Sequence, residues 1–252
     1  MKALVTGASS GIGKDITLEL VKRGYEIIAV AMEQDKLDEL KKEVPQVVQC
    51  IAMDLSNREN CFKLYDMLKD EDIDVLVNNA GFGTVGTFVE TNLDFETQMI
   101  DTNCVAVHIL MKLFLKDMVK KNKGRILNVS SIAAFSPGAN MATYFATKSY
   151  VYRLTQSVWQ ELKWMKSKVT VTVLCPSPTR TNFLDVANVK FSMNYLTSAY
   201  VAKCGVKAML KGKWCVTPGI SGKFTKVAAK LIPDKLMGKI VGRVPSKKDK
   251  NK

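Results

Sequence analysis

The sequence predicts an α/β protein in which helices cover both faces of a parallel β-sheet. Short apolar or β-branched segments alternate along the chain with longer segments of helical spacing, an order typical of strand–helix–strand units. One such segment, Val169-Thr-Val-Thr-Val-Leu174, is apolar or β-branched throughout, as expected for a strand covered on both faces. The length of 252 residues suits one domain of this kind with a sizeable core.

We expect seven strands, at residues 2–6, 25–31, 47–53, 73–77, 124–130, 168–175 and 214–217. Helical patterns fill the intervals between them, and the longest run from about 94 to 122 and from 143 to 165. Because no internal repeat or long linker interrupts this order, we expect a single domain over residues 1–245. Within it, residues 221–245 form a basic amphipathic extension, and residues 246–252 are expected to be a disordered tail.

The first expected strand runs into a glycine-rich turn, Thr6-Gly-Ala-Ser-Ser-Gly-Ile-Gly13, and a helical pattern follows. Glycines let a backbone approach a pyrophosphate closely, and a helix N-terminus offers free N–H groups and a positive dipole end. The segment therefore predicts a phosphate-binding loop, and a tight turn without a ligand is the plain alternative. The residues of this loop are Gly7, Ser9, Ser10, Gly11, Ile12 and Gly13.

The same turn also fits Gly-x-Ser-x-Gly, the nucleophile elbow of α/β hydrolases. A serine nucleophile needs a general base, but the single histidine, His108, lies in an apolar run where a packed side chain is the better interpretation. The elbow would also follow the first strand, whereas several strands normally precede it. The hydrolase hypothesis is therefore disfavoured.

Tyr144 and Lys148 lie four residues apart in an expected helix and so share one face. An ammonium beside a phenol favours the phenolate, which makes the tyrosine a proton donor or acceptor closer to neutral pH. Ser131 precedes the tyrosine by thirteen residues and offers a hydroxyl for the same substrate oxygen. This set suits carbonyl–alcohol chemistry, although the spacing alone also allows an ordinary surface pair.

Five motifs occur in order: the glycine turn, Asn78-Asn-Ala-Gly81, Asn103, Ser131 and Tyr144-x-x-x-Lys148. In this combination the chain resembles the short-chain dehydrogenase/reductase family from residue 1 to about residue 217, with phrasing around the tyrosine similar to bacterial members of undefined substrate. The resemblance implies a Rossmann-like, doubly wound sheet. It also implies an oxidoreductase that uses NAD(P)(H) to interconvert a carbonyl and an alcohol.

The resemblance also implies roles for the four candidate catalytic residues. Tyr144 would be the acid in reduction and the base in oxidation, and Ser131 would hydrogen-bond the substrate oxygen where negative charge develops. Lys148 would lower the pKa of the tyrosine and hold the nicotinamide ribose. Asn103 would support a proton-relay water, with an amide on a helix surface as the alternative. Ser130 is expected to point to the opposite face of its strand.

Further residues would hold the dinucleotide. Asp54 resembles the residue that binds the adenine, although it or Ser56 could instead cap the next helix. Asn79 and Gly81 would line the pocket beneath the ribose. Thr181 would bind the carboxamide, although Ser177 stands where the family usually has glycine.

The choice between NAD and NADP stays open. Glu33 falls twenty residues after Gly13, where a ribose-binding acid is expected, and it would disfavour a 2′-phosphate. Lys14 and Lys36 could offset its charge, and Ala31 lacks the carboxylate typical of NAD-using relatives.

The net charge of +13 is concentrated near the C-terminus. Residues 203–252 hold fourteen Lys or Arg against two Asp, a balance of +12, which leaves +1 for the other 202 residues. Phe224, Val227 and Leu231 share one helical face, and lysines share another. The favoured interpretation is a terminal helix that packs its apolar face on the substrate cleft or on a subunit. Contact with an anionic membrane, or an acidic or acyl-chain substrate, is the alternative, and nucleic acid is disfavoured.

The remaining features point to an intracellular enzyme. The six cysteines are scattered without metal-ligand spacing, no signal peptide precedes the first strand, and no run of about 18 apolar residues occurs, so we expect the cytoplasm and no metal.

Residues 182–212 are expected to cover the cleft and to favour a medium-sized hydrophobic substrate. A homodimer or homotetramer is expected from the resemblance. A dinucleotide-binding sensor or membrane-surface binding module is the alternative function.

Overall fold

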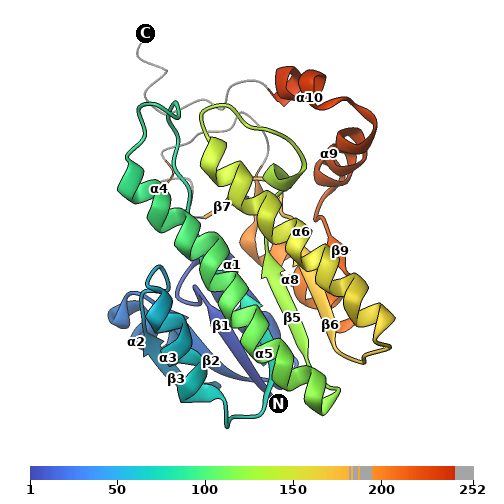
Figure 1. Cartoon of the computed structure of the whole chain (residues 1–252). Coiled ribbons are helices and arrows are strands. Elements are labelled where there is room, and N and C mark those ends of the chain that lie inside the picture. The colour runs from blue at the N-terminus through green and yellow to red at the C-terminus, as the bar shows by residue number, and fades with distance from the viewer. Residues whose placement is uncertain (182, 184–186, 188–194, 242–252) are drawn as a thin grey trace.

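The computed structural model describes residues 1–181, 183, 187 and 195–241 (Figure 1). Its main sheet has seven parallel strands in the order β3-β2-β1-β4-β5-β6-β9. The strands are β1 Lys2–Thr6, β2 Glu26–Ala31, β3 Val47–Ala52, β4 Ile73–Asn78, β5 Arg125–Val129, β6 Thr170–Leu174 and β9 Cys215–Val216. This confirms the doubly wound, Rossmann-like α/β fold. The order reverses between β1 and β4, where such sheets open a ligand crevice at the carboxyl ends of their strands.

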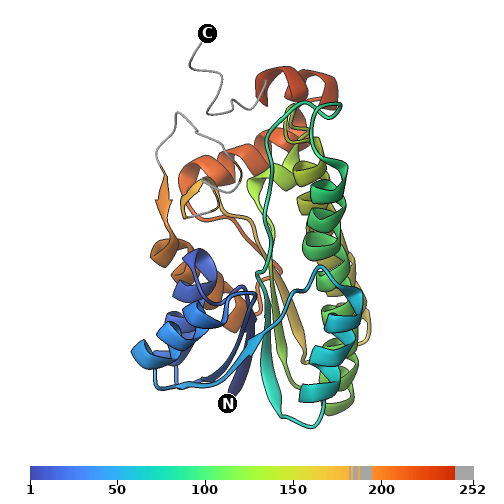
Figure 2. The ribbon, with the colours of Figure 1, turned by 90° about the vertical axis from the view of Figure 1, so that its left-hand side faces the viewer.

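Helices form a layer on each face of the sheet (Figure 2). One layer contains α1 Gly11–Val21, α2 Gln34–Glu43 and α8 Ser198–Leu210. The other contains α3 Arg58–Leu68, α5 Val107–Lys121 and α6 Ala142–Trp164. Because alternate side chains of a strand point to opposite faces, β1 feeds both layers: Ala3 and Val5 join the core under α1, and Leu4 joins the core under α5.

The long helix expected over residues 94–122 is divided into three parts. These are α4 Leu93–Ile100, a π-helical stretch η1 Asp101–Ala106, and α5. Single π-turns inside α-helices often occur at functional sites, because the wider turn re-aims the side chains on it. Here the π-helical stretch carries Asn103.

The segment after β6 differs from the expectation of a lid over residues 182–212. A small second sheet pairs β7 Thr179–Arg180 with β8 Leu196–Thr197, and α8 then packs on α1. Val201, Val206 and Met209 of α8 are fully buried in the core, so this helix belongs to the fold and the lid expectation is wrong for it. Residues 182, 184–186 and 188–194, which were also expected in the lid, lie outside the described residues.

The last described residues form two short helices, α9 Ile220–Leu231 and α10 Asp234–Val241, at the carboxyl end of the strands (Figure 1). The expected apolar face of α9 is exposed, with Phe224 at 74% and Leu231 at 78%. Packing of this face on the substrate cleft of the same chain is therefore wrong. The expected tail over residues 246–252 lies outside the described residues.

In the part of the chain that the structure describes, no helix is long and apolar enough to cross a membrane. The same residues contain no group of three or more His, Cys, Asp or Glu side chains placed to hold a metal ion.

Candidate active site

The glycine turn between β1 and α1 is shaped by backbone contacts that leave no room for side chains. Gly7 and Gly11 have φ angles of +63° and +52°, a region that L side chains rarely adopt. A Cβ on Gly13 would lie 2.0 Å from the carbonyl oxygen of Gly7. Ser10, at the N-cap of α1, makes no side-chain cap hydrogen bond. The turn therefore presents backbone and a helix N-terminus, as a phosphate cradle requires.

Thr6 and Asn79 fasten the end of β4 to this turn. The Thr6 hydroxyl oxygen accepts hydrogen bonds from the backbone N–H groups of Asn79 and Ala80, at 3.0 and 3.1 Å. Asn79 Nδ2 donates to the carbonyl oxygens of Thr6 and Gly7, at 3.0 and 3.1 Å. The sequence analysis assigned no role to Thr6. A hydroxyl residue at the end of an otherwise apolar strand was the available signal.

Ser131, Tyr144 and Lys148 lie together, as the sequence predicts. Tyr144 is on the first turn of α6 and Lys148 is one turn later, with exposures of 9% and 6%. Ser131 follows β5, caps a short 3₁₀ helix η2 Ile132–Phe135, and its hydroxyl lies close enough to the Tyr144 side chain to act on the pKa of the phenol. Lys148 Nζ lies 5.7 Å from the centroid of the Tyr144 ring and donates to the carbonyl oxygen of Val129 at 3.2 Å.

Burial dominates the protonation of this pair. It raises the pKa of Tyr144 to about 12, although the hydrogen bond from Ser131 acts in the opposite direction. Burial also lowers the pKa of Lys148 to about 8. The expectation that Lys148 lowers the pKa of Tyr144 is thus wrong for the chain alone, because desolvation disfavours both the phenolate and the ammonium.

Asn103 is buried, with an exposure of 1%, so the alternative of an amide on a helix surface is wrong. Its Oδ1 accepts a hydrogen bond from the Phe82 backbone N–H at 3.1 Å, and its Nδ2 donates to the Phe82 carbonyl oxygen at 2.9 Å. Nδ2 also donates to Thr147 Oγ1 of α6 at 3.1 Å. A Cβ on Gly81 would lie 2.6 Å from Asn103 Oδ1 and 3.3 Å from Lys148 Nζ, so these residues enclose a space that only glycine leaves open.

Asp54 lies beyond the carboxyl end of β3 and does not cap the next helix. Its Oδ1 accepts a hydrogen bond from the backbone N–H of Ser56 at 2.9 Å. The N-cap of α3 is Asn57, whose side chain accepts from the N–H of Glu59. The capping interpretation of Asp54 and Ser56 is therefore wrong, because the helix begins one residue later.

Glu33 is already paired with a neighbouring lysine, whereas Thr181 lies against the glycine turn. Glu33 follows β2, and its exposed carboxylate pairs with Lys36 at 2.7 Å, one turn further along α2. Lys14 instead pairs with Glu43 at 2.6 Å. Thr181 lies against the glycine turn, since a Cβ on Gly11 would come within 3.1 Å of its Cγ2. The geometry thus brings Thr181 to the turn and leaves the charge of Glu33 already paired.

The ring of Tyr144 is set among apolar side chains. The Phe183 ring centroid lies 5.2 Å from that of Tyr144, and Met141 and Ala187 belong to the same cluster. A Cβ on Gly83 would lie 3.0 Å from Tyr144 Cδ2, so the backbone also closes on the ring. Residues 182–212 were expected to cover the cleft, but no contact of Phe183 with the tyrosine was predicted from the sequence. These contacts explain the burial that raises the tyrosine pKa.

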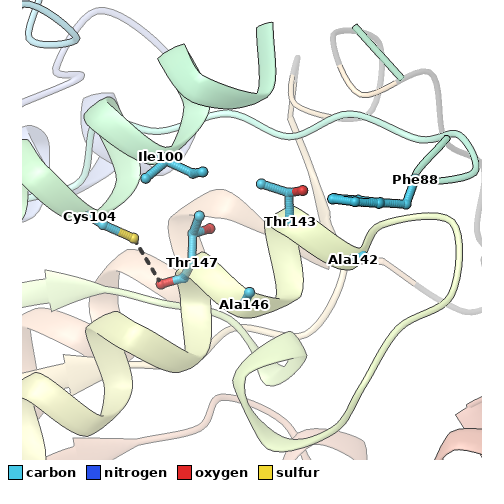
Figure 3. Close-up of a pocket in the computed structure, with 7 residues that line it drawn as sticks. All are labelled: Phe88, Ile100, Cys104, Ala142, Thr143, Ala146 and Thr147. Carbon is cyan, nitrogen blue, oxygen red and sulfur yellow. Dashed lines mark hydrogen bonds between the residues drawn. The ribbon is translucent and has the colours of Figure 1, made fainter. Parts of the chain in front are cut away.

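A separate hollow of about 420 Å³ lies on the other side of α6 (Figure 3). Across it, Cys104 Sγ of η1 donates to the carbonyl oxygen of Thr147 at 3.7 Å. Its lining residues are Phe88, Ile100, Cys104, Ala142, Thr143, Ala146 and Thr147. Since neither Tyr144 nor Lys148 lines it, this hollow is not the candidate active site.

The fold and the glycine turn together define a Rossmann-like dinucleotide-binding protein. A sequence model of the short chain dehydrogenase family matches residues 1–190. An uncharacterised short-chain type dehydrogenase/reductase of Sinorhizobium fredii is 36% identical over 186 residues, which cover 73% of this chain and 72% of that protein. The NADP-dependent 3-hydroxy acid dehydrogenase of Escherichia coli is 34% identical over 174 residues, 68% of this chain and 70% of that protein.

Solved structures agree with these relatives. A short-chain dehydrogenase from Sphingobium yanoikuyae in complex with NADPH has a TM-score of 0.82 at 25% identity and covers 91% of this chain and 93% of its own. A family member from Burkholderia phymatum in complex with NAD has the same TM-score at 19% identity, with coverage of 97% and 96%, and supports the fold. The chain belongs to the short-chain dehydrogenase/reductase family and is an NAD(P)-dependent oxidoreductase.

The residues present fit the dinucleotide that this family uses. The glycine turn keeps side chains away from the N-terminus of α1, where a pyrophosphate would bind. At the other end of the crevice, Gly81 leaves a space beside Lys148 Nζ, a cation suited to ribose hydroxyls. The pyrophosphate and one ribose of a dinucleotide therefore find suitable groups.

Proposed function

We propose that the protein interconverts a carbonyl and an alcohol on a medium-sized hydrophobic substrate. The observation that carries this proposal is the meeting of Ser131, Tyr144 and Lys148 at the crevice, where Lys148 Nζ lies 5.7 Å from the Tyr144 ring centroid and the Ser131 hydroxyl lies close enough to act on the pKa of the tyrosine. The apolar cluster around Tyr144, which includes Phe183, favours a hydrophobic substrate.

In reduction, Tyr144 donates its phenolic proton to the carbonyl oxygen, and in oxidation the phenolate takes the proton back. Ser131 donates a hydrogen bond to the same oxygen and stabilises the negative charge that develops there. NAD(P)H, when bound, supplies the hydride. Lys148 holds the ribose hydroxyls, and its charge supports the phenolate once a substrate and cofactor fill the site.

Asn103 acts in this scheme as a positioning residue. Its amide joins the Phe82 backbone to Thr147, and it lies on a π-helical stretch, a feature often found at functional sites. A water bound there would pass protons between Lys148 and solvent. The burial of Asn103 supports this role over a surface role.

We assign the cofactor contacts by the geometry of the crevice. The glycine turn and the N-terminus of α1 would hold the pyrophosphate, through Gly7, Ser9, Ser10, Gly11, Ile12 and Gly13. Asp54 would meet the adenine, Asn79 and Gly81 the ribose, and Thr181 the carboxamide. Glu33 would meet the adenosine ribose only after leaving Lys36, so the preference between NAD and NADP stays open.

We further propose a homodimer or homotetramer in the cytoplasm, with the domain extending over residues 1–245. The hollow in Figure 3 lies between the α4–η1 segment and α6, and exposed Ile100 and Phe88 line it. An apolar hollow flanked by exposed apolar side chains suits a subunit contact. A reducing compartment is supported by the six cysteines, all free in the described structure.

The proposal is tested by adding NADH or NADPH and a panel of apolar ketones and aldehydes to the purified chain. Loss of reduced-nicotinamide absorbance with at least one carbonyl compound is the expected result. Tight binding of either dinucleotide without consumption of any carbonyl or alcohol would support the sensor alternative instead.

A further inference from the structure

The outer face of α9 carries a continuous apolar stripe. Ile220, Phe224, Val227 and Leu231 recur at intervals of four, three and four residues, which places them on one side of a helix. Their exposures are 86%, 74%, 57% and 78%. Contiguous apolar surface of this kind marks an interaction site in a folded protein more often than chance exposure.

The inner face of α9 is fixed, so the stripe cannot turn inward without loss of contacts. Gly222 is buried, and a Cβ on it would lie 2.6 Å from Thr217 Cγ2 and 2.8 Å from Ser177 Oγ. Lys226 Nζ lies 4.7 Å from the Trp214 ring centroid and 2.9 Å from Cys215 Sγ. A small residue and an anchored lysine thus hold the helix with its apolar side outward.

The charge around the stripe limits its partner. Residues 220–241 hold five Lys against one Asp, a balance of +4, and Lys223 and Lys239 are exposed on α9 and α10. In a dimer formed through the same stripe on both copies, the positive charges of the two copies would repel each other. An anionic bilayer matches both features, since its headgroups attract lysines and its acyl region accepts apolar side chains.

The two helices also adjoin the candidate active site. The Cβ position of Gly222 lies 3.4 Å from Ile132 Cγ2, next to Ser131 in the chain, and that of Gly238 in α10 lies 3.4 Å from Pro137 Cγ. Both helices lie at the carboxyl end of the strands, where the crevice opens (Figure 1). A bilayer against α9 would therefore lie close to the mouth of the site.

We propose that α9 and α10 dock the protein on anionic lipid bilayers, and that its substrate is an amphiphilic carbonyl or alcohol drawn from the membrane. The docking proposal depends only on the exposed apolar and basic side chains of α9 and α10. The substrate source rests on the proposed function.

Docking is tested by co-sedimentation of the full chain with vesicles of phosphatidylcholine, with and without phosphatidylglycerol. We expect binding to the anionic vesicles that weakens in high salt. The double variant Phe224→Ser/Leu231→Ser should lower the partition coefficient about tenfold or more, because it removes two apolar side chains that would enter the bilayer. The matched control is Phe62→Ser/Met67→Ser on α3, where both side chains are also exposed and binding should be retained.

Failure of the wild type to sediment, or equal loss in both double variants, would overturn the docking. So would self-association that depends on Phe224 and Leu231 in the absence of vesicle binding, which would identify a second copy as the partner. Tyr144→Phe should bind vesicles like the wild type, so the test of docking is independent of catalysis.

For the substrate source, Phe224→Ser/Leu231→Ser should slow turnover of a vesicle-embedded ketone but not of a water-soluble one. Equal effects on both ketones would contradict it.

Discussion

The Ser130 hydroxyl donates a hydrogen bond to the backbone carbonyl oxygen of Lys148 at 2.7 Å. This bond ties the end of β5 to the helix that carries the catalytic candidates. The next residue, Ser131, directs its hydroxyl to Tyr144 instead. Two adjacent serines therefore have different tasks, one in holding the helix and one at the reacting centre.

Ser131→Ala should reduce kcat by about 10²- to 10³-fold, the usual effect of removing one donor to a developing oxyanion. Ser130→Ala should instead lower the free energy of unfolding by about 0.5–1.5 kcal/mol, because it removes one buried hydrogen bond between the end of β5 and α6. Steady-state kinetics and urea denaturation of both variants measure the difference. A larger kcat loss in Ser130→Ala than in Ser131→Ala would reverse the assignment.

Gly13→Ala should weaken dinucleotide binding about tenfold or more, because its Cβ would lie 2.0 Å from the Gly7 carbonyl oxygen and the turn must shift. Gly24→Ala is the control, since Gly24 lies outside the turn, has a positive φ of +79°, and nothing lies within 4 Å of its Cβ position. It should cost about 1 kcal/mol of stability and leave binding unchanged. Fluorescence titration with NADPH and NADH compares them, and equal affinities would contradict the cradle.

Lys148 gives the stability a distinctive pH dependence. Burial lowers its pKa from 10.5 to about 8, so between these values the folded state binds fewer protons than the unfolded state. Stability therefore rises with pH across this window, by on the order of 3 kcal/mol for the buried group, and the charge penalty is fully present below pH 8. The unfolding free energy of the wild type minus that of Lys148→Met should therefore become more positive from pH 7 to pH 10.5, by on the order of 3 kcal/mol. A constant difference would show that Lys148 is not desolvated.

Cys215 should be the fastest-reacting thiol near neutral pH. The hydrogen bond with Cys175 and the ammonium of Lys226 lower its pKa to about 6, whereas burial raises the pKa of Cys61 and Cys104 to about 11. Iodoacetamide labelling at pH 7, followed by peptide mass analysis, measures the rates. Lys226→Met should slow the labelling of Cys215, and an unchanged rate would contradict the contact.

The sequence located the seven strands within a residue or two at most boundaries, because burial on both faces leaves an unbroken apolar pattern. It also predicted that Ser131, Tyr144 and Lys148 lie together, because Tyr144 and Lys148 share one helix face and Ser131 lies at the end of a strand. Local spacing is sufficient for such relationships.

Contacts between segments far apart in the chain could not be predicted from the sequence. Asn103 and Phe82 are 21 residues apart, and the π-helical turn that brings Asn103 inward has no local signature in the sequence. The burial that raises the pKa of Tyr144 depends on its contact with Phe183, which comes from a different part of the chain. Helical periodicity showed that Phe224 and Leu231 share a face, but only tertiary contacts decide which face is covered.

Tyr144→Phe tests the central claim most directly, since it removes only the hydroxyl that donates the proton. We predict that kcat for carbonyl reduction falls by about 10²- to 10⁴-fold, the usual contribution of a general acid, with the dissociation constant of the reduced dinucleotide unchanged. Turnover in Tyr144→Phe close to that of the wild type, measured on the same carbonyl substrate, would contradict the account.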